Sequence, residues 1–382
     1  ASTAGPARTV SVRLGREQTD ALLHQVPAAY RTQINDVLLT ALGHALTGWT
    51  GRDSALIALE GHGREDVIAD ADLYRAVGWF TTEFPVAIHL PPGLGWGQAL
   101  KSVKEQLRAI PRRGLSYGAL RYLSGDGTPA AVLRDDPVPQ ISFNYSSQWD
   151  VPPEQGTTLL PVHEGAGQEL GPVTRPLTVT GLVTGGVLEL NWLYSAEMYD
   201  AATVRQVAER MVQALDQIVE HCRRPGAGGR TPSDFPLVTL DQAAVDRLAG
   251  DGSTVEDIWP LTPLQAGMLF HSVLDAGTAL YLNQARMLLD GVTDPRALGQ
   301  AWQQVIDRTP ILRGCVIWED VNEPVLVIHC RAAIPVTYHD WRSLPEAQRG
   351  THLQQILDDQ DADVDLAQPP LLRLAIAQLP GD

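Results

Sequence analysis

An apolar stripe at helical spacing in residues 34–49 constrains the fold of this chain more than any other feature of its sequence. Its members are Ile34, Val37, Leu38, Ala41, Leu42, Ala45, Leu46 and Trp49. The spacing predicts an amphipathic helix, which is stable only when its apolar face packs against another element. Thr32 is the expected N-cap, and Gly51 follows the last turn. The next segment, Ser54–Glu60, is mostly apolar and predicts a buried strand, so we expect the helix to pack on a sheet.

Further strands and helices are predicted to alternate around this pair. The expected strands lie at residues 8–14, 138–145 and 186–194, and the expected helices at 17–26, 96–110 and 200–222. The last of these helices carries a continuous apolar face, which again favours packing on a sheet. Together these segments predict an α/β unit over residues 1–222.

A change in composition after residue 222 predicts a domain boundary. Arg223–Arg230 has the sequence RRPGAGGR, which is typical of a linker, and we assign residues 223–254 to this connection. Residues 255–382 are expected to form a second unit, in which Thr262 and Gln265 make a capping box. Its predicted helices span 263–274 and 346–359, a third begins at Asp294, and its predicted strands lie near 283–289, 312–318, 324–329, 335–339 and 372–377. The residues of the third helix expected to face inward are Leu298, Ala301, Trp302, Val305 and Ile306.

Charge and cysteine content exclude several classes of function. The formal net charge of −16 over 382 residues argues against nucleic-acid binding, which needs clustered lysine and arginine. The three cysteines, Cys222, Cys315 and Cys330, have the spacing of neither a zinc site nor a disulfide framework. No metal is therefore predicted, and a reducing cytoplasm is the expected location. No stretch approaches the roughly 18 apolar residues of a membrane span, so no membrane association is predicted.

The strongest candidate for chemistry is Glu60, the last residue of the predicted strand. It opens into the loop Gly61–Arg64, with the sequence GHGR. Strand ends that lead into loops are where α/β proteins usually carry their functional groups. On spacing alone, a solvated surface glutamate is the simpler alternative. Trp79 and Phe80 lie further along the chain, and we expect them to form an apolar cluster that braces or covers Glu60.

Several stretches of the chain resemble the condensation-type domains of nonribosomal peptide synthetases. In residues 1–222 these stretches are YRTQINDVLL at 30–39, LEGHGRE at 59–65, AVGWFTTEFP at 76–85, RGLSYG at 113–118 and FNYSSQWD at 143–150. Their order resembles the C-terminal lobe of an epimerization domain. In residues 257–382 the stretches are IWPLTPLQAGMLFH at 258–271 and RTPILR at 308–313, which resemble the N-terminal part of a condensation domain.

This resemblance implies a fold, an activity and partners. The implied fold is α/β, with chloramphenicol-acetyltransferase-like half-domains, each a mixed sheet with packed helices, as two lobes joined by a linker. The implied activity belongs to antibiotic or other secondary metabolism: L-to-D epimerization of an aminoacyl or peptidyl thioester, followed by peptide-bond condensation. The substrate is expected on the phosphopantetheine arm of a peptidyl carrier protein, so that no cofactor binds this chain directly.

The resemblance also implies catalytic roles for three residues. Glu60 is expected to act as one acid–base partner in epimerization, with a pKa raised by desolvation. Asn144 and Tyr145 are expected to donate hydrogen bonds to the developing enolate or to orient the thioester. On the residues alone, a strand-end polar pair that caps its own loop explains Asn144 and Tyr145 equally well.

Four more residues are expected to support the site. His62 is an alternative base by type, but a histidine between two glycines more often bonds to the backbone, and we place it behind Glu60. Arg64 is expected beside it, in an ion pair with Glu65 or another local carboxylate. Trp79 and Tyr117 are expected to contact the substrate, although packing explains Tyr117 equally well.

One departure from the family's pattern bears on activity. Both kinds of domain carry the motif His-His-x-x-x-Asp-Gly in their N-terminal lobe, and no two histidines are adjacent in this sequence. The second histidine of that motif is the implied partner of Glu60, so we expect a piece of a longer synthetase that is inactive alone. The alternative hypothesis is a non-catalytic unit, in which two half-domains pair and only bind carrier proteins. A freestanding acyltransferase is disfavoured because acyl transfer also needs the motif.

Overall fold

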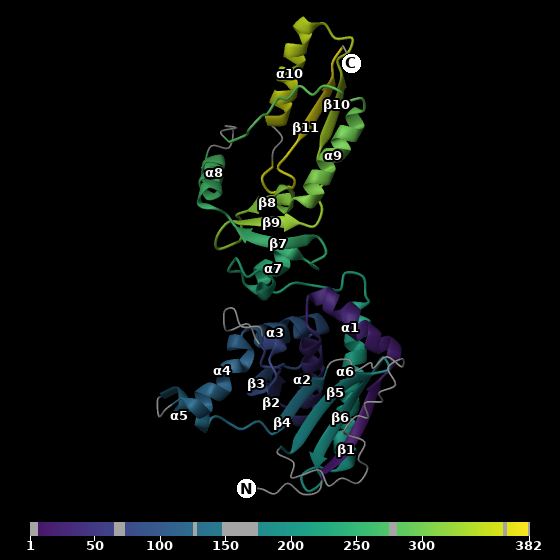
Figure 1. Cartoon of the computed structure of the whole chain (residues 1–382), viewed down its shortest axis with the longest axis vertical. Coiled ribbons are helices and arrows are strands. Elements are labelled where there is room, and N and C mark those ends of the chain that lie inside the picture. The colour runs from purple at the N-terminus through teal and green to yellow at the C-terminus, as the bar shows by residue number, and fades with distance from the viewer. Residues whose placement is uncertain are drawn as a thin grey trace. The chain divides into compact units, whose positions relative to one another are not determined.

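The computed structural model describes residues 7–64, 73–124, 128–146, 175–274, 281–361 and 365–380. The chain forms two compact units, Ala1–Gly228 and Gly229–Asp382, and each has a hydrophobic core of its own (Figure 1). The second unit therefore begins within residues 223–254, the segment that the sequence predicts to be a linker.

A six-stranded mixed sheet forms the frame of the first unit. Its strands are β1 (Ala7–Leu14), β2 (Ser54–Gly61), β3 (Thr82–His89), β4 (Ile141–Ser146), β5 (Leu177–Thr184) and β6 (Val187–Ser195). Their order across the sheet is β1-β6-β5-β4-β2-β3. Strand β4 runs parallel to both of its neighbours, β2 and β5, and the other neighbouring pairs are antiparallel. The mixed sheet confirms the predicted fold class.

The long helices of the first unit pack against one face of this sheet (Figure 1). They are α1 (Arg16–Tyr30), α2 (Ile34–Thr50), α3 (Trp96–Arg108) and α6 (Ala201–Cys222). The short elements are η1 (Leu73–Arg75), η2 (Pro111–Gly114), α4 (Leu115–Gly118), η3 (Ala119–Leu123) and α5 (Thr128–Asp135). Trp192 and Phe143 from the sheet and Leu42 and Met211 from the helices are completely buried between these layers. Burial of such side chains is the main favourable term in folding.

Helix α2 has the predicted apolar face and ends before Gly51, which has a positive φ of 68°. Its N-cap is Gln33, however, and the prediction of Thr32 is wrong. The Asp36 carboxylate accepts a hydrogen bond from the Gln33 N–H at 2.7 Å, in a capping box. Arg108 also holds Asp36, with 2.8 Å between the guanidinium and carboxylate atoms. A tertiary contact thus fixes the first turn, and the local sequence does not reveal it.

The sequence prediction misses strands β3 and β5. Strand β3 contains Pro85, which weakens the strand pattern, and the sheet tolerates it because β3 lies at the edge. Strand β5 has the alternating burial of a half-buried strand, but Gly181 interrupts its apolar series. Helix α1 is longer than predicted, since it continues through Pro27 to Tyr30.

The second unit contains a three-stranded sheet and a two-stranded parallel sheet. Its strands are β7 (Val255–Pro260), β8 (Gly314–Ile317), β9 (Val325–His329), β10 (Val336–Asp340) and β11 (Leu374–Gln378). Its helices are η5 (Pro232–Asp234), α7 (Gln242–Ala249), α8 (Pro263–Leu274), α9 (Pro295–Arg308), η6 (Pro310–Arg313) and α10 (Glu346–Asp361). Helix α8 has the predicted bounds and capping box, in which the Thr262 N–H donates to the Gln265 side chain at 2.9 Å.

Much of the predicted linker belongs to the core of this second unit. Phe235 and Val245 pack in the same cluster as Val255 and Ile258. Arg230 is buried as well, and its guanidinium donates to the Gly252 carbonyl at 2.6 Å. Glycine and arginine suggest a solvated connection, but the apolar residues that follow them find partners only in the tertiary fold.

Two further predictions for the second unit are wrong. Residues 283–289 do not form a strand, and Met287 and Leu288 in this segment are largely exposed. An extended apolar segment becomes a strand only where a neighbour pairs its backbone groups. In helix α9 the buried residues are Gly299 and Ile306, whereas Val305, expected to face inward, is 46% exposed.

Candidate active site on the polar face of the sheet

Glu60 lies beside Asn144 at the end of two parallel strands. Strands β2 and β4 pair in a register that aligns Leu59 with Phe143, so the next residue of each strand projects from the same face. The Asn144 side-chain amide donates a hydrogen bond to Glu60 Oε2 at 2.6 Å. The structure therefore brings together two of the residues that the sequence singles out.

These two side chains belong to a polar row on the face of the sheet opposite the core. The register aligns Asn144 with Thr180, Thr180 with Asn191 and Asn191 with Ser11. Within this row, the Ser11 hydroxyl donates to Asn191 Oδ1 at 2.5 Å. Asn144, Thr180 and Asn191 are each half-buried. The row gives Glu60 a surface of hydrogen-bonding groups next to it, on which a polar ligand can be held.

The charge environment of Glu60 favours its protonated form. Burial raises the pKa of Glu60 above the ordinary glutamate value, the nearby Glu83 carboxylate raises it further, and the Arg175 guanidinium lowers it. Glu83 is the direct partner of Glu60 in the antiparallel register of β2 and β3. A carboxylate with a raised pKa is suited to exchange protons nearer to neutral pH. The sequence analysis misses Glu83 and Arg175, and only the register of the unpredicted strand β3 could have revealed Glu83.

Tyr145 lies on the other face of the sheet. Successive residues of a strand point to opposite faces, so Tyr145 shares the core face with Phe143. Its ring packs over Gly181, where an added Cβ would come within 3.2 Å of it. Burial raises the pKa of the Tyr145 hydroxyl. The structure therefore brings Asn144, but not Tyr145, to Glu60.

The loop after β2 is held by its own side chains. The Arg64 N–H donates to His62 Nδ1 at 3.0 Å, so that His62 bonds to the backbone. The Arg64 guanidinium contacts the Leu73 carbonyl, donates to the Ala76 carbonyl at 3.0 Å, and lies 4.3 Å from the centre of the Phe80 ring. Arg64 thus ties the loop to the segment that follows it. Its predicted partner, Glu65, lies outside the residues that the structure describes.

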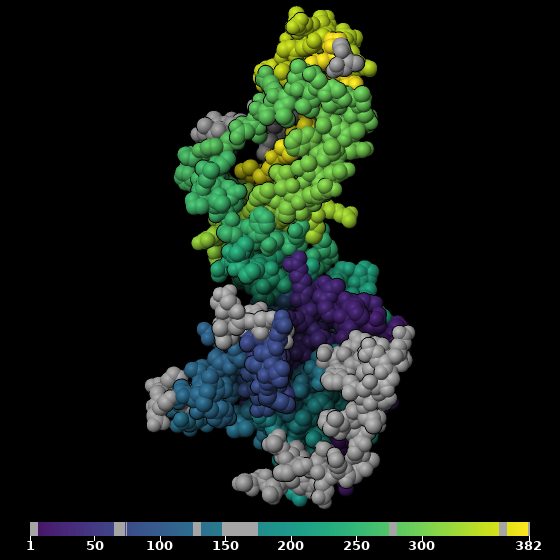
Figure 2. Space-filling view, viewed as in Figure 1, coloured from purple at the N-terminus to yellow at the C-terminus, as the bar shows by residue number. Residues whose placement is uncertain are grey.

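Trp79 does not cover Glu60 as expected. The Trp79 side chain is 91% exposed, so Trp79 does not join Phe80 in a cluster that braces Glu60. The buried aromatic residue of this stretch is Phe84, on strand β3. Tyr117 is half-buried, and its hydroxyl accepts a hydrogen bond from Arg121. Tyr117 belongs to the segment from α4 to α5 that projects at the side of the first unit, in blue in Figure 2.

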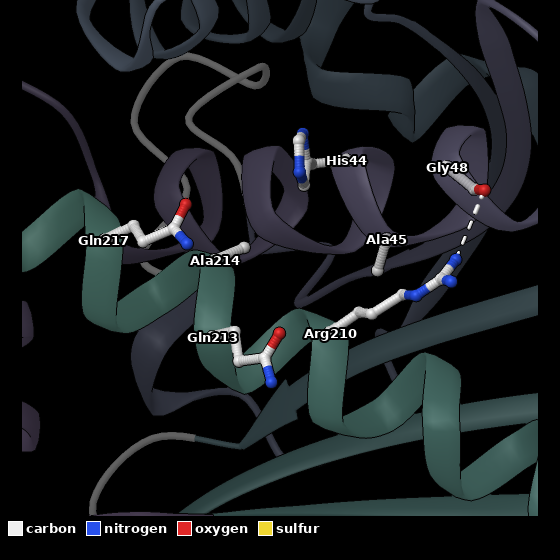
Figure 3. A pocket seen from close by; sticks show the side chains of 7 residues that line it. All are labelled: His44, Ala45, Gly48, Arg210, Gln213, Ala214 and Gln217. Carbon is white, nitrogen blue, oxygen red and sulfur yellow. Dashed lines mark hydrogen bonds between the residues drawn. The ribbon is translucent and has the colours of Figure 1, made fainter.

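A pocket lies between helices α2 and α6, on the helical side of the unit (Figure 3). It has a volume of about 370 Å³ and is lined mainly by polar groups, including His44, Gln213 and Gln217. Arg210 closes one end by donating to the Gly48 carbonyl at 3.2 Å. Because these helices cover the core face, the pocket is separate from the Glu60 row.

The described ranges contain no group of three or more histidine, cysteine, aspartate or glutamate residues placed to hold a metal ion. The helices found in them are too short or too polar to cross a bilayer.

Comparison with known proteins identifies the fold and then the family. The chain is 35% identical to the epimerization domain from the third module of tyrocidine synthetase B, with a TM-score of 0.53 over 58% of this chain and 50% of that structure. The fold is accordingly the α/β, chloramphenicol-acetyltransferase-like fold of condensation and epimerization domains. The family model of the condensation domain matches residues 4–236 and 255–380. The chain belongs to the condensation-domain family of nonribosomal peptide synthetases.

Two relatives match the chain over different shares of its length. One of the linear gramicidin synthase proteins of Brevibacillus parabrevis is 42% identical over 383 aligned residues, which cover 99% of this chain and 7% of that protein. Tyrocidine synthase 1 of the same organism is 35% identical over 249 residues, covering 63% of this chain and 23% of that protein. The chain thus spans only a small part of the length of these relatives.

Proposed function

We propose that the first unit is the C-terminal lobe of an epimerization domain and that the second unit is the N-terminal part of a condensation domain. In this proposal the longer synthetase converts a carrier-bound aminoacyl or peptidyl thioester from L to D and then uses it in peptide-bond formation. The observation that carries the proposal is the 2.6 Å hydrogen bond from Asn144 to Glu60, a carboxylate whose pKa is raised at the end of a strand.

The proposed reaction moves one proton at each face of the α-carbon. The thioester carbonyl acidifies the Cα–H bond, and the Glu60 carboxylate accepts this proton while the electron pair forms an enolate. A second acid then delivers a proton to the opposite face of the enolate, which inverts the centre. Glu60 then loses the proton it accepted to solvent and the second acid gains one, so both groups are restored for the next reaction. Asn144 holds one oxygen of Glu60 through its amide, so the carboxylate is oriented before the substrate arrives.

The similarity to the tyrocidine epimerization domain supports this assignment for the first unit. The second acid would be the histidine of the His-His-x-x-x-Asp-Gly motif in the N-terminal lobe of the same domain. The thioester would arrive on the phosphopantetheine arm of a peptidyl carrier protein in the cytoplasm, and this chain would bind no cofactor of its own. The family match to residues 255–380 supports the condensation role of the second unit.

A reconstituted domain tests the proposal. The chain is joined to an N-terminal lobe that carries the histidine motif, and carrier proteins loaded with a panel of L-aminoacyl pantetheines are the substrates. We expect D-aminoacyl product by chiral chromatography, and exchange of the α-proton with deuterated water. Loss of both signals in Glu60→Gln, with Glu189→Gln as the control on the same sheet, supports the assignment. Carrier binding without exchange in the unsubstituted domain would instead favour the non-catalytic docking unit.

A further inference from the structure

The cross-strand partner of Glu60 is itself charged and is held in an ion pair. We propose that Glu83 and Arg175 act as a pair of positioning residues that set the pH at which Glu60 gains and loses its proton, an inference that rests on the proposed function of Glu60. The family resemblance implies a role for neither residue. Their placement by the fold is the basis of the argument.

Glu83 opposes the ionisation of Glu60 by its position. Strands β2 and β3 are antiparallel, and Glu60 and Glu83 are directly opposite in their register. Side chains directly opposite on one face of an antiparallel pair are close neighbours, and like charges there repel. The Glu83 side chain is 46% exposed, so its own charge is hydrated while it acts on the more enclosed Glu60. Glu83 therefore makes an ionised Glu60 less favourable.

Arg175 offsets this repulsion from a fixed position. Its guanidinium forms an ion pair with the Glu83 carboxylate and donates a second hydrogen bond to the Pro139 carbonyl at 2.7 Å. The Arg175 side chain is only 15% exposed, and its bond to Pro139 holds it beside the segment that enters β4. A positive charge held by both the backbone and Glu83 is placed to favour the ionised form of Glu60.

The other polar groups near Glu60 are an amide on strand β4 and the side chains of the loop after β2. On strand β4 its neighbour is the neutral amide of Asn144. In the loop after β2, Arg64 is directed to the Leu73 and Ala76 carbonyls, and His62 accepts from the backbone. Glu83 and Arg175 are the charged groups that shift the pKa of Glu60 among the residues described, and they shift it in opposite directions.

Because Glu83 and Arg175 act on Glu60 in opposite directions, substitutions can distinguish a charge effect from a merely structural one. If Arg175 and Glu83 only joined strands, removing either would loosen the sheet, and both substitutions would change Glu60 in the same way. If they act through charge, Glu83→Gln removes repulsion and makes Glu60 easier to ionise. Arg175→Gln removes an attraction and leaves Glu83 uncompensated, which makes Glu60 harder to ionise.

A titration of Glu60 in the intact chain tests the inference. The glutamate side-chain carboxyl carbons are labelled with ¹³C, the Glu60 resonance is assigned from its absence in Glu60→Gln, and its chemical shift is followed with pH. We expect the midpoint to move to lower pH in Glu83→Gln and to higher pH in Arg175→Gln. The midpoint in the double variant should lie between those of the two single variants. The midpoint in Arg175→Lys should stay near the wild-type value because lysine keeps the positive charge.

A comparable ion pair elsewhere on the sheet supplies the control. Arg13 on β1 and Glu189 on β6 are cross-strand partners, with 2.8 Å between the guanidinium and carboxylate atoms. They lie toward the edge of the sheet opposite to β3. Arg13→Gln removes an ion pair of the same kind and should leave the Glu60 midpoint unchanged. Thermal unfolding of each variant confirms that it is folded. If Arg175→Gln does not fold, the Glu60 midpoint in Glu83→Gln alone tests the inference, since this substitution removes only the repulsive charge.

The results also distinguish this inference from the proposed function. Midpoints that stay constant, or that move in the same direction in Glu83→Gln and Arg175→Gln, overturn the inference even if Glu60→Gln abolishes epimerization. Opposite shifts of the Glu60 midpoint, combined with full epimerization activity of Glu60→Gln, would support the inference about Glu83 and Arg175 but would exclude Glu60 from the reaction.

Discussion

The two faces of the six-stranded sheet in the first unit are made by alternate residues of the same strands, yet they differ in almost every physical property. On the core face, Phe143 and Trp192 are completely buried under the helices. On the other face, the neighbouring residues Asn144 and Asn191 belong to a half-buried polar row. If the proposed function is correct, the core face contributes mainly to stability and the polar face to catalysis, so substitutions on the two faces should affect different measurements.

Glu60→Gln should have the largest effect of any single substitution on the polar face. In the reconstituted epimerization domain we expect the rate to fall by roughly 10²- to 10⁴-fold, the usual contribution of a general acid or base. Thermal stability should change little, because glutamine has nearly the same shape. The measurement is the rate of α-proton exchange under single-turnover conditions. A rate within a factor of about two of wild type would contradict this assignment, since Glu60 on the polar face would then take no part in catalysis.

Trp192→Ala should show the opposite pattern on the core face. Trp192 is completely buried, and replacing a buried tryptophan by alanine costs about 3–5 kcal/mol through lost burial and the cavity that remains. Chemical denaturation of the intact chain measures this change. Thr180→Ala, one strand away on the polar face, should cost less than about 1 kcal/mol. Similar losses of unfolding free energy in the two variants would contradict the proposal that the core face contributes more to stability than the polar face.

Asn144→Ala and Tyr145→Phe test the comparison with adjacent residues. Asn144→Ala removes the hydrogen bond to the Glu60 carboxylate, and we expect roughly a 10- to 100-fold loss of epimerization rate. Tyr145→Phe should leave the rate close to wild type, because Tyr145 lies on the core face. Both rates are measured in the reconstituted domain. A larger loss in Tyr145→Phe than in Asn144→Ala would contradict the orientation of strand β4.

The smallest expected effect is on stability as a function of pH. The pKa of Glu60 is raised in the folded chain, so the favourable contribution of its protonated form is fully present below the pKa of an unfolded glutamate. This contribution is lost as the pH rises through the higher, folded value. Glu60→Gln should therefore be slightly more stable than wild type at neutral pH and equal to it in acid. Differential scanning calorimetry at several pH values measures the difference, and a variant that is less stable at neutral pH would contradict it.

The helical elements could be predicted well from the sequence. The stripe of residues 34–49, the N-terminal capping box of helix α8, and the bounds of helix α6 all follow from local spacing and local hydrogen bonds. Strands were harder to predict, because pairing with a distant neighbour decides them. Strand β3 tolerates Pro85 at the edge of the sheet, whereas residues 283–289 have the apolar pattern but do not form a strand.

The residues of the candidate site also differ in how well the sequence predicts their placement. Glu60 and Asn144 stand out in the sequence as polar residues at strand ends. The carboxyl group of Glu60 suggests proton transfer, and the amide of Asn144 suggests hydrogen bonding. The alternation of Phe143 and Tyr145 with polar neighbours could also have placed Tyr145 on the core face. Trp79, in contrast, was expected to pack beside Glu60 because it is apolar, and it lies exposed.

Residue types and their spacing along the chain were enough to predict the α/β class, the family resemblance, most of the helices and Glu60 as the candidate carboxylate. The tertiary structure decided which groups surround that carboxylate. Glu83 reaches Glu60 only through the pairing of β2 with β3, and Arg175 reaches Glu83 across 92 residues of sequence. Charge interactions depend on distance in space, and only the folded sheet sets that distance.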